Sequence, residues 1–124
     1  MEPAEFAARL TLADEAERER LLREHAECVD ASLARALNAI YLEAYAGDPS
    51  RALRAAECLA LVERVSQDPE VEALAAWTRG MAAIHQQGQM ERGVALLGEA
   101  TDRFTALGHP LDAAARPARA GSPA

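Results

Sequence analysis

Apolar residues recur at intervals of three and four positions along residues 71–107, on both sides of Gly88. This spacing places side chains on one face of an α-helix, so it predicts two amphipathic helices joined by a turn. The apolar positions are Leu74, Trp77, Met81 and Ile84 before the glycine, and Val94, Leu97, Ala100, Phe104 and Leu107 after it. We therefore expect a helical hairpin to be the structural unit of this chain.

The preceding stretch has the same organisation. We expect a helix over residues 31–46, capped by Asp30, and a second helix that starts at Asp48-Pro49 and ends near residue 65. Aspartate suits a helix cap because its carboxylate accepts hydrogen bonds from free N–H groups, and proline suits the first turn. A second Asp-Pro pair opens the hairpin described above.

The N-terminal part is the most charged. We expect a short helix over residues 3–10, and a longer one over residues 12–28 with Thr11 as its N-cap. Opposite charges four residues apart meet on a helix surface. The pairs with this spacing are Asp14 with Arg18, Glu19 with Arg23, and Arg20 with Glu24.

Two hairpins are related by a spacing of about forty residues. Gly47 and Gly88 differ by 41 positions, as do the small residues Ala52 and Gly93. We expect an all-α fold of covering helices, two degenerate hairpins and a flexible tail. These parts span residues 1–29, 30–67, 68–108 and 109–124. The hairpins are expected to stack as a short α-solenoid, with a closed helical bundle as the alternative.

The second hairpin resembles a tetratricopeptide repeat (TPR). The matching positions are Trp77 and Ile84 in the first helix, Gly88 at the turn, and Met90, Gly93 and Ala100 in the second helix. A small residue lets two helices approach closely, and a glycine after a helix adopts the left-handed conformation without steric cost. Met81 and Leu97 depart from the pattern, which wants a small and an aromatic residue there. Any antiparallel helical hairpin is the simpler alternative.

A second resemblance is to the N-terminal repeat region of large bacterial TPR proteins, among them those with a CHAT protease domain. It covers roughly residues 15–114 and rests on the phrases ERERLLREHAE, DPSRALRAAE, DPEVEALAAWTRGMAAIHQQGQMERGVALL and FTALGHPLDAA. No protease domain is included in this stretch, so no catalytic residue carries over. The resemblance implies an interaction or regulatory module.

Charge and composition restrict the partners. The 124 residues carry a net charge of −7, and all 13 basic side chains are arginine. An acidic chain repels phosphate backbones and anionic membrane surfaces, so we expect neither nucleic acid nor membrane as a partner. There is no signal peptide and no long apolar run, and Cys28 and Cys58 are isolated, which favours free thiols in a cytoplasmic protein.

The sequence contains no clear catalytic or metal-binding motif. His25, His85 and His109 lie on separate segments, and the glycines occur singly rather than in a phosphate-binding loop. His25 and Cys28 share one helix face but lack further ligands. We therefore expect a non-enzymatic protein without a cofactor or metal.

The TPR resemblance predicts a partner-binding surface. In such repeats the exposed flank of each first helix lines the concave side, where tyrosine offers rigid contact area and polar groups fix a peptide backbone. The candidate residues are Arg35, Asn38 and Tyr45 from the first hairpin and Thr78, His85 and Gln86 from the second. Arg79 is a further candidate for the rim. These residues could equally border solvent without a partner.

Two other functions remain open. No C-terminal capping helix is recognisable, so the last hairpin should expose an apolar strip at Leu97, Phe104 and Leu107. That strip would suit a homodimer, or a further part of a longer protein. A small-molecule sensor with a pocket near Trp77 is the third possibility.

Overall fold

The computed structural model describes residues 1–108 and shows only helices within them. The elements are α1 (Pro3–Leu12), α2 (Glu15–Glu24), the 3-10 helix η1 (Ala26–Cys28), α3 (Ala31–Ala44), α4 (Pro49–Val65), α5 (Pro69–His85) and α6 (Met90–Leu107). The predicted all-α class is therefore confirmed for the described part of the chain. The expected tail, with His109, lies outside the described residues.

Aspartates and glycines set the limits of the four longer helices. Asp30 accepts a hydrogen bond from the Leu33 amide, and Asp48 and Asp68 cap α4 and α5 in the same way. Pro49 and Pro69 occupy the first turns of α4 and α5, where no N–H is needed. The turn before α6 contains Gly88 with φ of 63°, a conformation that glycine adopts without strain. The predicted helix starts and the turn are confirmed.

The N-terminal helices differ from the prediction. Thr11 does not cap a helix, because it lies inside α1, buried, and its hydroxyl donates to the Ala7 carbonyl at 2.8 Å. Asp14 is the actual cap of α2, since its carboxylate accepts from the Glu17 amide at 2.8 Å. The prediction of a single helix over residues 12–28 is therefore wrong. The chain is non-helical between α1 and α2, and η1 follows α2 as a separate short helix.

Of the three predicted charge pairs in this region, one forms. Arg20 binds Glu24 at 2.8 Å. Arg18 instead turns inward, where its Nε donates to the Leu10 carbonyl at 3.0 Å and its Nη1 lies 3.3 Å from Glu57 of α4. Arg18 is only 6 % exposed, so it fastens α2 to α1 and α4.

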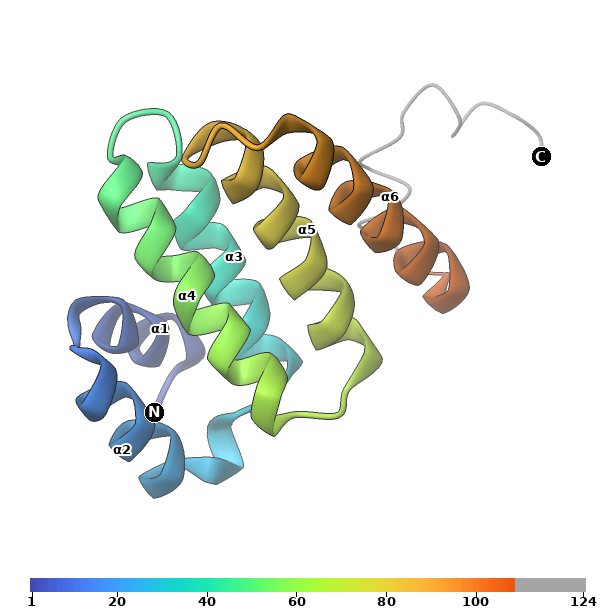
Figure 1. Cartoon of the computed structure of the whole chain (residues 1–124). Helices are drawn as coiled ribbons and strands as arrows, with labels where there is room; N and C mark the ends of the chain where they lie inside the picture. Colours follow the sequence, from blue (N-terminus) through green and yellow to red (C-terminus); the bar gives the residue numbers. More distant parts are fainter. Residues whose placement is uncertain (109–124) are drawn as a thin grey trace.

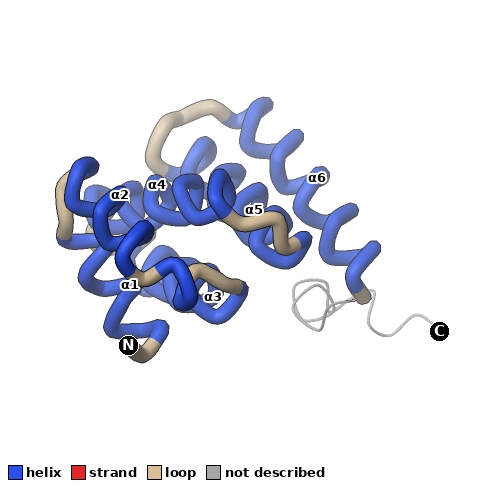
Figure 2. Tube along the Cα trace, turned by 90° about the horizontal axis from the view of Figure 1, so that it is seen from below, coloured by secondary structure: helices blue, strands red, loops and turns tan. Residues whose placement is uncertain are grey.

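The four longer helices lie side by side, with α5 between the α3–α4 pair and α6 (Figure 1). α3 and α4 pack together, α5 packs on both of them, and α6 packs chiefly on α5. α1 covers α3 and α4 on the side away from α6, as the view from below also shows (Figure 2). α5 is consequently an inner helix, whereas α6 forms one edge.

Small residues allow the close approach of α5 and α6. An ideal Cβ at Gly93 would lie 2.8 Å from the Gly80 carbonyl oxygen, and one at Gly80 would lie 3.0 Å from the Gly93 carbonyl oxygen. The two backbones therefore touch at this crossing. On the same side of α6, Ala100 and Phe104 are buried against α5.

The exposed apolar surface of α6 differs from the predicted strip. Phe104 is 4 % exposed and belongs to the core, so it cannot form an open contact surface. Met90 and Val94 are 59 % and 58 % exposed although the pattern placed Val94 inward, and Leu107 is 40 % exposed. α5 covers the side of α6 that carries Gly93, Ala100 and Phe104, and the three exposed residues lie outside that side. None of the helices within residues 1–108 is long and apolar enough to cross a membrane.

Candidate interaction surface

The six predicted site residues all lie where α3 meets α5. Contacts pair early residues of α3 with early residues of α5 and late with late, so the two helices run parallel. The residues within this α3–α5 interface fall into a buried part and an exposed part. Their contacts decide which of them remain available to a partner.

Arg35 and Glu70 join the N-terminal ends of the two helices. The Arg35 guanidinium donates to both carboxylate oxygens of Glu70, at 2.6 and 2.9 Å. The hydrogen bonds that Arg35 donates to Glu70 raise the pKa of Arg35 above its ordinary value. The Arg35 side chain is 53 % exposed whereas that of Glu70 is 14 % exposed, so the ion pair lies at the edge of the helix contact and is partly buried. Glu70 was not among the predicted residues; its position in the first turn of α5 indicates only a favourable interaction with the helix dipole and does not point to Arg35.

Asn38 and Thr78 were expected on an exposed flank, and this expectation is wrong. They are 7 % and 1 % exposed, and the Asn38 amide donates to the Thr78 hydroxyl at 3.1 Å. Each polar group satisfies the other inside the helix contact, as buried polar groups must. They hold α3 against α5 and cannot touch a partner without separating the helices.

Gln86 is also engaged within the protein. The Tyr41 hydroxyl donates to Gln86 Oε1 at 2.9 Å, and Gln86 Nε2 is 3.5 Å from the Tyr45 carbonyl oxygen. Tyr41 is fully buried, and burial raises the pKa of its phenol to about 12. Gln86 itself is half-buried, so part of its side chain stays accessible.

Four rings gather at this interface, and we call them the aromatic cluster: Tyr41, Tyr45, Trp77 and His85. The Tyr41 ring stacks on Tyr45 with centroids 6.0 Å apart, and Trp77 meets Tyr41 edge-on at 6.3 Å. Tyr45 and His85 lie 5.2 Å apart with a tilt of 58°. Tyr45 and Trp77 are half-buried and His85 is exposed. The structure thus brings Tyr45 and His85 together on one side, as expected.

The cluster contains both tyrosines and the only tryptophan of the chain. The prediction missed Tyr41 as part of it because helical spacing places Tyr41 on the flank of α3 without showing which helix covers that flank. The spacing of 40 residues that pairs Leu37 with Trp77 was the available signal for a parallel α3–α5 contact.

Arg79, the candidate for the rim, faces a different neighbour. Its guanidinium donates to Glu63 of α4 at 2.5 Å. Arg79 therefore tightens the α4–α5 contact and lies away from the aromatic cluster.

Residues 1–108 contain no group of three or more His, Cys, Asp or Glu side chains arranged to hold a metal ion. Comparisons with protein-family models, with curated proteins and with solved structures gave no match.

Proposed function

We propose that this chain is a non-catalytic protein-interaction module, built as two TPR-like hairpins stacked in a short solenoid. In this proposal it binds an extended peptide or protein segment on the α3–α5 face and serves as an adaptor or regulatory part of a bacterial system. The observation that supports it is the aromatic cluster at the α3–α5 interface, in which Tyr45 and Trp77 are partly exposed and His85 is exposed. Tyrosine and tryptophan are enriched where proteins bind each other, because a rigid ring buries a large area at small entropic cost.

The contact residues of this proposal are Tyr45 and His85, flanked by Arg35 and Gln86. Tyr45 offers a half-buried ring held in place by Tyr41, and His85 offers an exposed ring beside it. A ring that is already held loses little freedom when a partner arrives. Arg35 supplies a charged group at the other end of the interface.

Peptide selection tests the proposal even though the partner is unidentified. A random peptide library displayed on phage would be selected against the whole chain, and synthetic copies of enriched peptides would be measured by fluorescence anisotropy. We expect Tyr45→Ala and His85→Ala to weaken binding at least about tenfold, the size typical of a central interface residue. Glu91→Ala, an exposed change on α6, is the control and should leave affinity unchanged.

Circular dichroism of each variant separates binding from folding. Neither Tyr45→Ala nor His85→Ala should change the helical signal, because both side chains lie at helix ends. Selected peptides that bind all variants equally, or no enriched peptide at all, would contradict the proposal.

A second candidate is self-association through α6. The exposed Met90, Val94 and Leu107 favour it, because water-exposed aliphatic side chains gain by covering one another. Sedimentation velocity with tens of micromolar protein tests whether the chain self-associates. A wild-type dimer that Val94→Glu converts to a monomer supports this candidate. A wild-type monomer excludes it.

A further inference from the structure

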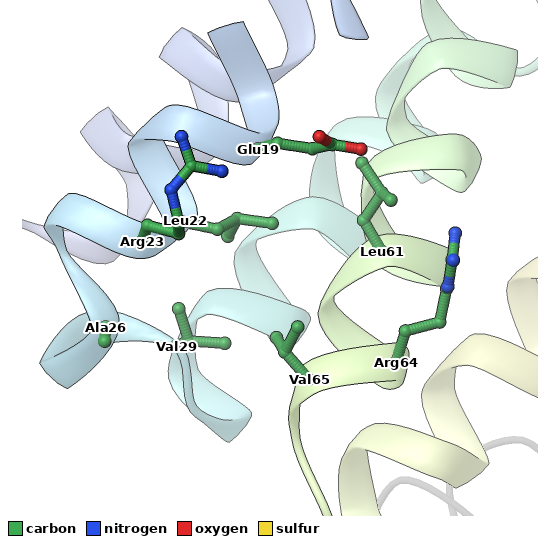
Figure 3. Close-up of a pocket in the computed structure, with 8 residues that line it drawn as sticks. All are labelled: Glu19, Leu22, Arg23, Ala26, Val29, Leu61, Arg64 and Val65. Carbon is green, nitrogen blue, oxygen red and sulfur yellow. The ribbon is translucent and has the colours of Figure 1, made fainter. Parts of the chain in front are cut away.

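A cleft of about 520 Å³ separates α2 and η1 from the C-terminal half of α4 (Figure 3). It lies away from the aromatic cluster, on a different pair of helices. Its size falls in the range of small-molecule sites in proteins. One end of α2 is fastened to α4 by buried Arg18, and the cleft opens beyond that attachment.

The floor of the cleft is aliphatic. Leu22 from α2, Val29 before α3, and Leu61 and Val65 from α4 line it. Figure 3 shows their side chains pointing toward one another across the opening. Val65 is 63 % exposed and Val29 and Leu61 are partly exposed, so these side chains face water in the cleft, whereas Leu22 is buried beneath them. A hydrocarbon chain would cover that surface.

Two arginines lie on the walls of the cleft, Arg23 from α2 and Arg64 from α4. The side chain of neither forms an ion pair or a hydrogen bond with another residue of the described part, 1–108. The predicted pair of Glu19 with Arg23 does not form. Six other arginines do have acidic partners, namely Arg18, Arg20, Arg35, Arg51, Arg79 and Arg103. In this view the Glu19 carboxylate lies between the two free guanidinium groups (Figure 3).

We propose that this cleft binds a small aliphatic carboxylate. The hydrocarbon chain would lie on the floor, and the carboxylate would accept hydrogen bonds from Arg64 and Arg23. A guanidinium suits this role because it donates two parallel hydrogen bonds to a carboxylate. A chain with net charge −7 repels anions in general. Two arginines without side-chain partners among residues 1–108, beside an apolar floor, offset that repulsion locally for an anion with a hydrocarbon chain.

Substitution of Glu19 should change the affinity for the ligand in the opposite direction to substitution of the arginines. Its negative charge opposes a bound carboxylate, so the neutral Glu19→Gln variant should bind the ligand more tightly. A variant that merely loosens the fold would weaken binding instead. The proposal therefore predicts two opposite changes from two residues of one cleft.

Octanoate is the probe, titrated into the full chain by isothermal calorimetry. We expect saturable binding with one site, about tenfold weaker in Arg64→Gln and Arg23→Gln, and several-fold tighter in Glu19→Gln. Arg54→Gln is the matched control, since Arg54 is an exposed arginine of α4 that lies outside the cleft and has no side-chain partner within residues 1–108. It should bind octanoate as the wild type does.

Octan-1-ol and acetate test the two halves of the ligand separately. Each should bind at least tenfold more weakly than octanoate, because the first lacks the charge and the second the chain. Methyl NMR signals of Leu22, Leu61 and Val65 should shift on titration. Absence of saturation, equal binding of octan-1-ol, or equal loss in Arg54→Gln would overturn the proposal.

A peptide with a C-terminal leucine also carries a carboxylate next to an aliphatic side chain. A short peptide with a free C-terminal leucine should be compared with octanoate and with the same peptide as its amide. If the free peptide binds much more tightly than octanoate and the amide does not bind, the natural ligand is the C-terminus of a peptide. Tyr45→Ala should leave both affinities unchanged, so failure here and failure of the proposed peptide surface are separate results.

Discussion

The contact between α5 and α6 can be tested with one substitution at two positions of the same helix. Gly93→Ala introduces a Cβ that would lie 2.3 Å from Ile84 Cγ1 and 2.8 Å from the Gly80 carbonyl oxygen. The Ile84 side chain can rotate, but the carbonyl belongs to the α5 backbone. Relief of that clash requires α6 to move away from α5, its main neighbour.

Gly98→Ala is the matched comparison. No atom lies within 4 Å of a Cβ added at Gly98, which is exposed in the same helix. Both substitutions gain up to about 1 kcal/mol because alanine favours a helix over glycine. Overpacking at Gly93 costs about 1–3 kcal/mol, and more when a backbone must shift. We expect Gly93→Ala to destabilise by about 1–2 kcal/mol and Gly98→Ala to stabilise by about 0.5–1 kcal/mol.

Thermal unfolding followed by circular dichroism measures the difference. For a chain of this length each kcal/mol corresponds to roughly 3–6 °C, so the two variants should differ in Tm by on the order of 10 °C. Gly93→Ala combined with Ile84→Ala should not recover the wild-type stability, because the carbonyl clash persists. If Gly93→Ala and Gly98→Ala stabilised the protein equally, the close crossing of α5 and α6 would be refuted.

Three further predictions concern buried groups. Asn38→Leu should cost about 1–3 kcal/mol in urea unfolding because it leaves the buried Thr78 hydroxyl without its donor, and adding Thr78→Val should restore most of this; an additive double variant would contradict the pairing. In the folded state the pKa of the Tyr41 phenol is about 12, against an ordinary value of 10.0, so folding favours the neutral phenol. The stabilisation is therefore complete below pH 10, and the free energy of unfolding falls by roughly 2–3 kcal/mol as the pH rises to 12. Tyr41→Phe should flatten that part of the pH profile, and an unchanged slope would count against it. Burial raises the pKa of the Cys58 thiol to about 11, so iodoacetamide at pH 8 should modify half-buried Cys28 and spare Cys58 until denaturant is added; mass spectrometry of equal labelling would refute this.

Helix boundaries from Asp30 onward could be predicted because local chemistry determines them. The Asp-Pro pairs supply an N-cap acceptor and a residue that needs no N–H, and Gly88 supplies the positive φ of the turn. These are interactions between residues a few positions apart, and they leave a direct trace in the sequence.

The N-terminal region could not be predicted in the same way because distant contacts decide it. Thr11 and Asp14 both suit an N-cap, and only the burial of Thr11 in α1 selects Asp14. Arg18 does not pair with Asp14, four positions before it. It binds the Leu10 carbonyl and Glu57, which is 39 positions away. Helical spacing predicts neither the N-cap of α2 nor the partners of Arg18.

The six candidate residues lie together at the α3–α5 contact, but the prediction that all of them are exposed is wrong, because Asn38 and Thr78 are buried. The TPR resemblance implies that all six residues lie on the flanks of the two first helices, but it does not show which of them face the other helix. Asn38 and Thr78 differ from Tyr45 and His85 by about two helical turns, so they share a flank. The parallel packing of α3 and α5 covers the middle of that flank and leaves its C-terminal end open.

This division changes what the proposed surface can recognise. A groove lined along its whole length by polar groups would hold an extended peptide through its backbone, whereas here the polar groups in the middle already bind each other. Recognition then depends on the rings at the C-terminal ends of α3 and α5, where Tyr45 is supported from behind by buried Tyr41. Such a site favours a partner that places one large apolar or aromatic side chain against the rings. Peptides selected against this protein should therefore share a single bulky residue rather than a long polar motif.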